Sequence, residues 1–274
     1  MPAPRNINDS ERPANDAERP ANDSEGPVSR AEMRRGLSLV VPFYNEAELL
    51  PENLAAIYQF LQRAGIAFEL ILANDGSSDN GPLIAADFAV AHPGCVLVST
   101  ERNTGKGGAL KLGIASATLP LIGYIDVDLE IPLAHLGEAL DCLATHLEVS
   151  LCAGSKLQVD NAAQRASHRN LGSRIYNALA RGILGSRVSD HQCGLKVFRR
   201  EVSDAVLPHV VEDSWAFDTE FLVRAQMAGF FVREIPVRLC PSRSSRVPFW
   251  RVAPKMFARL LHLRRLGVRV SCAR

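Results

Sequence analysis

From Leu37 onward, short apolar runs alternate with helical patterns, and this alternation constrains the fold more than any other feature of the sequence. Short, wholly apolar runs are typical of strands buried in a parallel sheet. Strands are predicted at residues 37–42, 68–73, 95–99 and 120–125, with helices between them at 46–64, 80–91 and 106–117. This order predicts an α/β fold with a mostly parallel central sheet and helices on both faces.

The two ends of the chain differ in composition from this region. Residues 8–28 contain three copies of a heptapeptide, NDSERPA, NDAERPA and NDSEGPV, each with a proline and almost no apolar side chain. Such a segment cannot bury enough surface to offset the entropy lost on ordering, so residues 1–36 are predicted to be a disordered leader, with a docking tag as the functional alternative. Residues 241–274 hold nine Lys and Arg and no Asp or Glu, and form a basic tail.

Composition excludes several classes of protein. The net charge is +1, the mean hydropathy is close to zero, and no run of eighteen apolar residues occurs. A membrane bundle, a wholly disordered chain and a globally basic nucleic-acid binder are therefore excluded. The six cysteines form no CxxC pair and no signal peptide pattern is present, which predicts free thiols in a reducing cytoplasm.

Polar clusters follow each of the four predicted strands. They lie at residues 44–46, 74–79, 101–108 and 126–128. Ligands of open α/β sheets lie beyond the carboxyl ends of the strands, so four polar clusters along this edge predict a binding site.

Asp126 and Asp128 are the sharpest signal in these clusters. Two carboxylates directly after a buried strand place negative charge where desolvation penalises it, and a hard divalent cation such as Mg²⁺ or Mn²⁺ would remove that penalty. Glu130 could add a third oxygen ligand. The alternative is an acidic turn that caps a helix beginning near Pro132.

The other two loops have a structural interpretation and a functional one. The amide and carboxylate groups of Asn74 to Asp79 could pair with a nucleobase, or form only a turn and a helix cap. The glycine-rich loop from Asn103 to Ala109 could receive phosphate oxygens at a helix N-terminus, or be only a tight turn.

Basic side chains form a second predicted half of the site. Lys156 follows a short strand at 149–153, and Arg165 and Arg169 open a helix that ends near Leu184. A single Arg on such a helix is more often a solvated surface group. His168 and His191 are more often hydrogen-bonded structural residues than ligands.

Together these segments resemble the dolichyl-phosphate glucose and mannose synthases of the inverting glycosyltransferase family 2. The resemblance covers about Leu37 to Val247. It rests on motifs at residues 42–46, 74–79, 103–108, 126–128, 190–196, 217–220 and 245–247, of which the string Asp190-His-Gln-Cys-Gly-Leu-Lys196 is most similar to the lipid-phosphate branch.

The resemblance implies a GT-A-type fold that binds a nucleotide-diphosphate sugar, UDP-glucose or GDP-mannose, with Mg²⁺ or Mn²⁺. Residues 37–240 would then be the nucleotide-sugar-binding domain. The resemblance implies a role for each of four groups of residues. Around the nucleoside it places Pro42, Tyr44, Glu46, Asn74 and Asp75, and elsewhere in the donor site Asn103 and Lys106. At the metal and diphosphate it places Asp126, Asp128 and Glu130, and at the acceptor phosphate Lys156, Arg169, Ser245 and Arg246. The chain departs from the family pattern at Asn74, usually Asp, at Lys156, often Arg, and at Glu130, often Gln.

These parts predict an inverting, metal-dependent hexosyltransferase whose acceptor is a polyprenyl phosphate. A phosphate acceptor is mostly dianionic at neutral pH and needs cations for positioning rather than a general base. Two alternatives remain open. One is a hydroxyl acceptor on a glycolipid or small molecule, with Asp218 or Glu220 as the base; the other is a non-catalytic nucleotide-binding module that docks on membranes.

The basic tail is predicted to contain a short helix from Pro254 to about Leu266. Its apolar side chains, Phe257, Leu260, Leu261 and Leu263, suit a helix lying in an anionic membrane interface, which predicts a cytoplasmic protein peripherally bound to the membrane or to a membrane-protein partner. The alternative is a helix packed on the domain with a solvated basic side. The tail lacks a stacking platform, so nucleic acid is not an expected partner.

Overall fold

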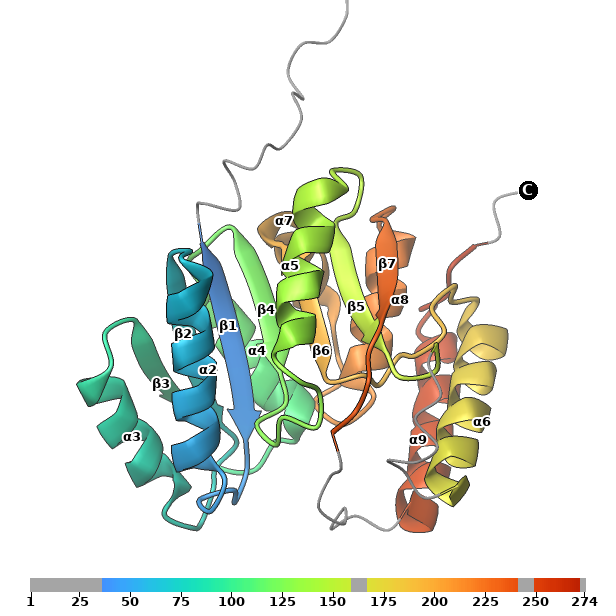
Figure 1. Ribbon diagram of the computed structural model, residues 1–274. Helices are drawn as coiled ribbons and strands as arrows, with labels where there is room; N and C mark the ends of the chain where they lie inside the picture. The colour runs from blue at the N-terminus through green and yellow to red at the C-terminus, as the bar shows by residue number, and fades with distance from the viewer. Residues whose placement is uncertain (1–35, 159–166, 241–248, 272–274) are drawn as a thin grey trace, which may run out of the picture.

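A single seven-stranded sheet organises the computed structural model, which describes residues 36–158, 167–240 and 249–271 (Figure 1). The strand order within this described part is β3-β2-β1-β4-β6-β5-β7. The strands are β1 (Leu37–Phe43), β2 (Phe68–Asn74), β3 (Cys95–Ser99), β4 (Leu121–Ile125), β5 (Leu151–Ser155), β6 (Leu195–Arg199) and β7 (Val232–Pro236).

The first four strands confirm the predicted parallel half of the sheet. β1 pairs in parallel with β2 on one side and with β4 on the other, and β3 extends the sheet beyond β2. All seven residues of β1 are buried, because side chains alternate between the two faces and helices cover both. Their carboxyl ends therefore meet at one edge, as the sequence predicts.

The other half of the sheet is mixed. β6 lies between β4 and β5 and runs antiparallel to both, whereas β7 is parallel to β5. The central sheet is thus mostly parallel, which confirms the predicted α/β class.

Helices cover both faces of the sheet, and each face has its own apolar core. Leu39 and Val41 of β1 belong to one core and Val40, between them, to the other. The first face carries α2 (Leu50–Ala64), α3 (Gly81–Ala91) and α5 (Ala134–Thr145); the second carries α4 (Lys106–Ser116), α7 (Arg200–Val206), the 3₁₀ turn η1 (Leu207–His209) and α8 (Phe217–Met227).

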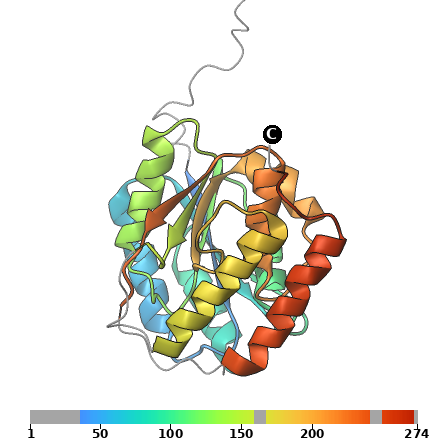
Figure 2. The same ribbon diagram turned by 90° about the vertical axis from the view of Figure 1, so that its right-hand side faces the viewer.

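Two further helices, α6 (Ser167–Leu184) and α9 (Phe249–Arg265), pack side by side at one end of the sheet (Figure 2). A third apolar core joins Leu184 of α6 to Met256, Leu260 and Leu263 of α9. The C-terminal helix is therefore packed on the domain, which is the second of the two interpretations of its sequence, and Leu260 and Leu263 are not available to a membrane. Among the described helices, none has the length and apolar character needed to cross a bilayer.

Some of the residues that the sequence analysis singled out lie outside the described part of the chain. They are the leader up to residue 35, Arg165, Ser245 and Arg246, and the side chains of His168 and Arg169. The disorder of the leader and the acceptor roles of Arg169, Ser245 and Arg246 stay predictions.

Candidate active site at the carboxyl edge of the sheet

The loops after β1 and β2 are joined by hydrogen bonds. The backbone N–H of Ser78 donates to Oδ1 of Asn45 (2.8 Å), and the backbone N–H of Ala47 donates to Oδ2 of Asp79 (2.9 Å). Asn45 has a positive φ of 54°, which bends the chain away from the strand. Tyr44, just before it, is exposed at this edge, Glu46 is half-buried, and Pro42 is buried within β1.

Asn74 and Asp75, predicted to contact a nucleoside, are buried and hold neighbouring loops. Oδ1 of Asn74 accepts the backbone N–H of Ser77 (3.0 Å), and its Nδ2 donates to Ser99 Oγ (3.2 Å). The carboxylate of Asp75 accepts the backbone N–H groups of Thr104 (2.8 Å) and Gly105 (2.9 Å) and the Thr104 hydroxyl. The contacts of Asp75 fix the position of the glycine-rich loop. Contact of either residue with a base stays a prediction.

The glycines of that loop allow close packing against the segment before α8. A Cβ on Gly105 would lie 2.5 Å from the Asp213 carbonyl oxygen, and one on Gly107 would lie 2.6 Å from Cβ of Phe217. Gly105 also has a φ of 101°, which side chains rarely adopt. These glycines therefore have a structural role, the loop places Lys106 at the start of α4, and phosphate binding by the loop stays a prediction.

Lys106 points from this loop to the acidic cluster after β4. Its ammonium lies 2.6 Å from Oδ1 of Asp126 and 3.6 Å from Oδ2 of Asp218. Burial alone would lower the pKa of Lys106, but the two carboxylates outweigh it and raise the pKa above its usual value. The half-exposed ring of Trp215 lies 5.8 Å from the same ammonium.

Asp126 and Asp128 stand at the edge of the sheet, in differing surroundings. The other carboxylate oxygen of Asp126 lies against Gly194, where an added Cβ would come within 2.0 Å of it. Asp128 is exposed, yet partial desolvation and the carboxylate of Asp126 raise its pKa. The backbone between them is held by Asn53 of α2, whose Nδ2 donates to the Val127 carbonyl (2.7 Å).

A second ion pair supports this cluster from inside the core. Lys196 of β6 is fully buried and lies 2.6 Å from Oδ1 of Asp218, which also accepts a hydrogen bond from the Tyr124 hydroxyl (2.5 Å). Burial would raise the pKa of Asp218, but Lys196 and Lys106 outweigh it and hold the pKa below its usual range. A chain of charges thus runs from the core to the sheet edge: Lys196, Asp218, Lys106 and Asp126.

Neither carboxylate considered as a general base is free to act as one. Asp218 is buried within the network just described. Glu220 is fully buried as well: it accepts the backbone N–H groups of Val211 and Glu212 and pairs with Arg224 at 2.7 Å. Both side chains are held by these partners, which favours a phosphate acceptor over the alternative of a hydroxyl acceptor with a base at either position.

Lys156, at the end of β5, is tied to the motif 190–196. Its Nζ donates to the Gln192 carbonyl (2.9 Å), and its backbone N–H donates to Oδ2 of the buried Asp190 (2.9 Å). Two residues beyond Gln192, Gly194 contacts Asp126. One short loop therefore links the residue predicted at the acceptor to the residue predicted at the donor.

His191, within the same motif, is a structural residue. Its ring is fully buried between Asn177 Oδ1 (2.7 Å from Nδ1) and Ser186 Oγ (2.8 Å from Nε2). Burial lowers its pKa to about 4, so the ring is neutral at physiological pH. The structural interpretation of this histidine is confirmed.

Oxygen donors at this edge fit a hard cation, but the protein does not supply a full set. The described residues contain no group of three His, Cys, Asp or Glu side chains placed to hold one ion, so the three carboxylates of Asp126, Asp128 and Glu130 do not form a ready site. One reason is that Lys106 occupies one side of Asp126. A cation here would need further oxygens, such as those of a diphosphate.

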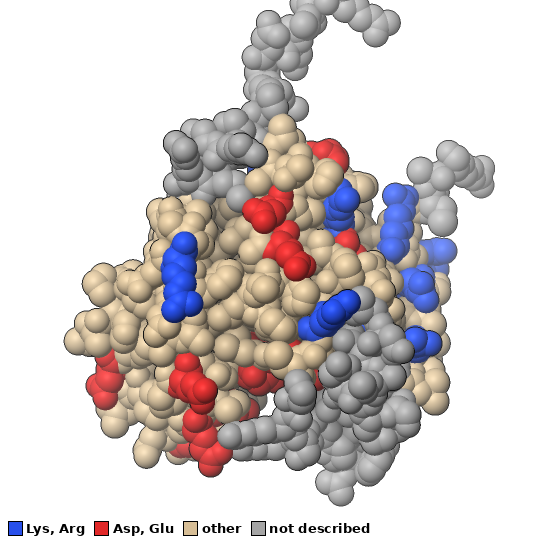
Figure 3. Space-filling view, viewed as in Figure 1, with Lys and Arg blue, Asp and Glu red and all other residues tan. Residues whose placement is uncertain are grey.

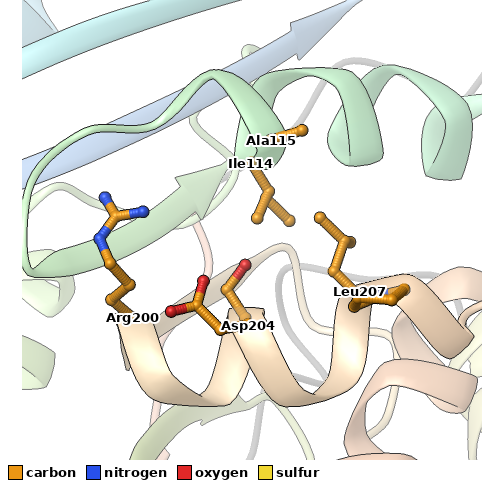
Figure 4. A pocket seen from close by; sticks show the side chains of 7 residues that line it. Ile114, Ala115, Arg200, Asp204 and Leu207 are labelled. Carbon is orange, nitrogen blue, oxygen red and sulfur yellow. The ribbon is translucent and has the colours of Figure 1, made fainter.

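The hollow drawn in Figure 4 lies away from this edge. It has a volume of about 370 Å³ between the end of α4, which supplies Ile114, and the helical segment α7–η1, which supplies Arg200, Asp204 and Leu207. Arg200 follows Arg199, which pairs with the first residue of β4. The hollow is thus at the amino end of β4, opposite the acidic cluster, and has no part in the site.

Comparison with known proteins shows which family the chain belongs to. Residues 38–207, from β1 through η1, match the family described as glycosyl transferase family 2. The chain belongs to this family. The region matched includes Asp126 and Asp128 and the loop 190–196, which links Asp126 to Lys156.

Relatives extend the match over most of the domain. The glycosyltransferase AglD of Haloferax volcanii is 36% identical over 213 residues, which are 77% of this chain and 34% of that protein. The dolichyl-phosphate β-glucosyltransferase ALG5C of Trichomonas vaginalis is 32% identical over 73% of this chain and 62% of its own length, and the human dolichyl-phosphate β-glucosyltransferase is 29% identical over 78% and 70%. The chain thus spans about a third to two thirds of these relatives.

Solved structures confirm the GT-A-type fold predicted from the sequence. Glucosyl-3-phosphoglycerate synthase from Mycobacterium tuberculosis, crystallised with Mn²⁺, UDP and glucosyl-3-phosphoglycerate, superposes with a TM-score of 0.62 at 18% identity over 88% of this chain and 82% of that one. The mannosyltransferase PcManGT from Pyrobaculum calidifontis, in complex with GDP-mannose and Mn²⁺, gives a TM-score of 0.59 at 23% identity over 82% and 64%.

Some residues of the site were missed by sequence reasoning. Lys196 ends the motif 190–196 but was given no role of its own, and Tyr124 lies in a predicted strand; their partner Asp218 is 94 positions from Tyr124. Nothing local in the sequence signals such a contact. Trp215 could have been singled out, because it is one of only two Trp residues in the sequence and lies next to the motif 217–220.

Proposed function

We propose that this protein transfers a hexose from a nucleotide-diphosphate sugar to a polyprenyl phosphate. The observation that carries the proposal is the loop 190–196, which contacts Asp126 through Gly194 and Lys156 through Gln192. Donor and acceptor would then meet at one edge of the sheet. The names of the dolichyl-phosphate relatives support the lipid acceptor.

On the donor side, Asp126 and Asp128 would hold Mg²⁺ or Mn²⁺ together with diphosphate oxygens, with Glu130 as a further candidate. Bound there, the cation would stabilise the charge that develops on the departing diphosphate. Lys106 stands beside Asp126 and adds a fixed positive charge at the same place. Asp75 holds the loop that positions it.

On the acceptor side, a phosphate oxygen would attack the anomeric carbon from the face opposite the diphosphate and so invert it. A dianionic phosphate needs no base, which agrees with the burial of Asp218 and Glu220. Lys156 is the described cation for this phosphate, with Arg169, Ser245 and Arg246 as its proposed partners.

The test is a donor screen of the full chain with UDP-glucose and GDP-mannose, Mg²⁺ or Mn²⁺, and a short-chain polyprenyl phosphate. The expected product is a lipid-linked sugar that mild acid releases. Asp128→Asn is expected to lower kcat about 100-fold or more. Asp141→Asn, on the exposed side of α5, is the matched control and should leave kcat unchanged.

Three outcomes contradict the proposal. An acid-stable glycoside would assign a hydroxyl acceptor, and tight nucleotide binding without turnover of any donor would assign a non-catalytic module. Full activity of Asp128→Asn would contradict the metal assignment.

We further propose that the protein works at the cytoplasmic face of a membrane, where a polyprenyl phosphate resides, either by direct contact or through a membrane-protein partner.

A further inference from the structure

α6 exposes an apolar row that the fold does not use. Leu171, Ile175 and Leu179 recur every four residues and are 61%, 53% and 38% exposed. They are turned about 140° around the helix from the buried row that packs against α9. Large apolar side chains repeated along one exposed helix face mark a surface that binds something.

α9 continues this surface beside α6. Because Met256, Leu260 and Leu263 are buried between the two helices and the domain, Phe257 and Leu261 remain outside, 41% and 38% exposed. The two helices lie side by side (Figure 2), and each of them carries exposed apolar residues. We name Leu171, Ile175, Leu179, Phe257 and Leu261 the outer apolar face.

The charge around the outer apolar face has a single sign. Neither helix contains an Asp or Glu. The described exposed cations of the two helices are Arg174, Arg181, Lys255, Arg259, Arg264 and Arg265, of which Arg259 lies 3.5 Å from the buried Glu212 carboxylate. Figure 3 shows Lys and Arg along the right-hand edge, at the end of the molecule where these helices lie.

We propose that the outer apolar face and its basic rim dock the protein on an anionic lipid bilayer. An apolar helix face surrounded by cations is the pattern that lies in the headgroup region, with apolar side chains inserted and cations on anionic headgroups. This surface differs from the one predicted from the sequence of the tail in two ways. The helix α6 supplies three of its five apolar residues, and Leu260 and Leu263 are buried in the core instead of exposed.

The helix α9, which carries part of the docking surface, contacts the acceptor side of the site through its buried face. The Gln192 side-chain amide contacts Met256 Sδ of α9 at 4.0 Å, and the Gln192 carbonyl accepts the hydrogen bond from Lys156. A bilayer held against α6 and α9 would therefore present a lipid phosphate near Lys156. This last step rests on the proposed function; the docking itself does not.

The experiment compares two charge-matched double variants of the full chain. Ile175→Glu with Leu179→Glu alters the outer apolar face. Leu83→Glu with Val90→Glu adds the same charge at exposed positions of α3, at the opposite end of the sheet (Figure 1). Co-sedimentation with vesicles of phosphatidylglycerol and phosphatidylcholine is measured at low and high salt, and transfer to a water-soluble short-chain polyprenyl phosphate is measured without vesicles.

The unmodified chain is expected to bind anionic vesicles, more weakly at high salt. The α6 variant should lose about tenfold or more in vesicle partitioning, while the α3 variant should bind nearly as well as the unmodified chain. Equal loss in both variants, or no vesicle binding by the unmodified chain, overturns the proposal. So does a dimer in sedimentation velocity that only the α6 variant dissociates, because the face would then bind a second copy.

Activity separates this proposal from the proposed function. Neither substituted position of α6 belongs to the catalytic site, so transfer to the soluble acceptor should be equal in all three proteins. Vesicle binding that depends on Ile175 and Leu179 in a protein that transfers no sugar would support docking and contradict the function. Loss of soluble transfer in the α6 variant alone would show that the face belongs to the site, and would overturn the docking role.

Discussion

At the scale of single residues, Asp218 is buried beneath the site, yet it positions a charged side chain of the site. It compensates the fully buried Lys196 and holds Lys106 near Asp126. Asp218→Asn leaves the Lys196 ammonium buried without a carboxylate, and removing one partner of a buried pair costs about 3–5 kcal/mol. We expect a loss of that size in the free energy of unfolding, measured by urea denaturation.

The control for this prediction removes both charges. Asp218→Asn combined with Lys196→Met leaves no buried ion, so the double variant should be more stable than Asp218→Asn alone. If the double variant were less stable than either single variant, packing rather than charge would determine the free energy of unfolding at this pair. A fully stable Asp218→Asn would contradict the network.

His191 gives a prediction about pH. Its pKa in the folded protein is about 4, whereas that of an unfolded histidine is about 6.5. Between these values the unfolded chain binds more protons, so stability is full above about pH 6.5 and falls by up to about 3 kcal/mol as the pH drops towards 4. Urea unfolding at about pH 7.5 and pH 5 should show a smaller difference for His191→Gln than for the unmodified chain.

The matched control is His146→Gln, at a half-exposed histidine after α5. This variant should keep the pH dependence of the unmodified chain. If both variants lose it equally, or neither does, the buried ring is not its source.

At the scale of elements, the loop 190–196 needs a glycine where it meets Asp126. A Cβ at position 194 would lie 2.0 Å from Oδ2 of Asp126, so Gly194→Ala must push the carboxylate aside. Misplacing a reacting or binding group by about 1 Å can cost a factor of about 100 in rate. We expect Gly194→Ala to lose about that much in kcat with little change in unfolding midpoint.

Gly182→Ala is the control for a glycine without such a neighbour. No atom lies within 4 Å of its added Cβ, and it sits in the exposed part of α6. Alanine there should raise stability by about 0.5–1 kcal/mol and leave kcat unchanged. An active Gly194→Ala would show that Asp126 need not occupy its observed position.

Elements differ in how far the sequence alone predicted them. The four parallel strands and the helices between them agree within a few residues, because a strand buried on both faces has a continuous apolar run that needs no partner to be recognised. The antiparallel β6 and the helix α7 were not predicted, since strand direction depends on long-range pairing. In the site, Asp126, Asp128 and Lys106 were predicted and do lie together, whereas their buried support from Asp218 and Lys196 depends on contacts between distant segments.

At the scale of the whole molecule, the C-terminal helix is a component of the domain rather than an appendage. Three apolar cores are joined through the sheet and α8: Val223 of α8 belongs to the core between α6 and α9, and Phe221 belongs to the core under the sheet. Arg259 of α9 also lies 3.5 Å from the buried carboxylate of Glu212. A basic composition alone could not reveal this, since an amphipathic helix can cover a protein or a membrane equally well.

Neighbouring leucines on α9 allow this integration to be tested. Leu260 is fully buried and Leu261 is 38% exposed, although they differ by one position. If α9 folds with the domain, Leu260→Ala should lower the free energy of unfolding by about 2–4 kcal/mol in a single cooperative transition, and Leu261→Ala should lower it far less. Vesicle binding should respond in the opposite order, because only Leu261 belongs to the outer apolar face. Equal and small effects of both changes on unfolding would mean that α9 is a detachable tail, and the surface it shares with α6 would no longer be fixed.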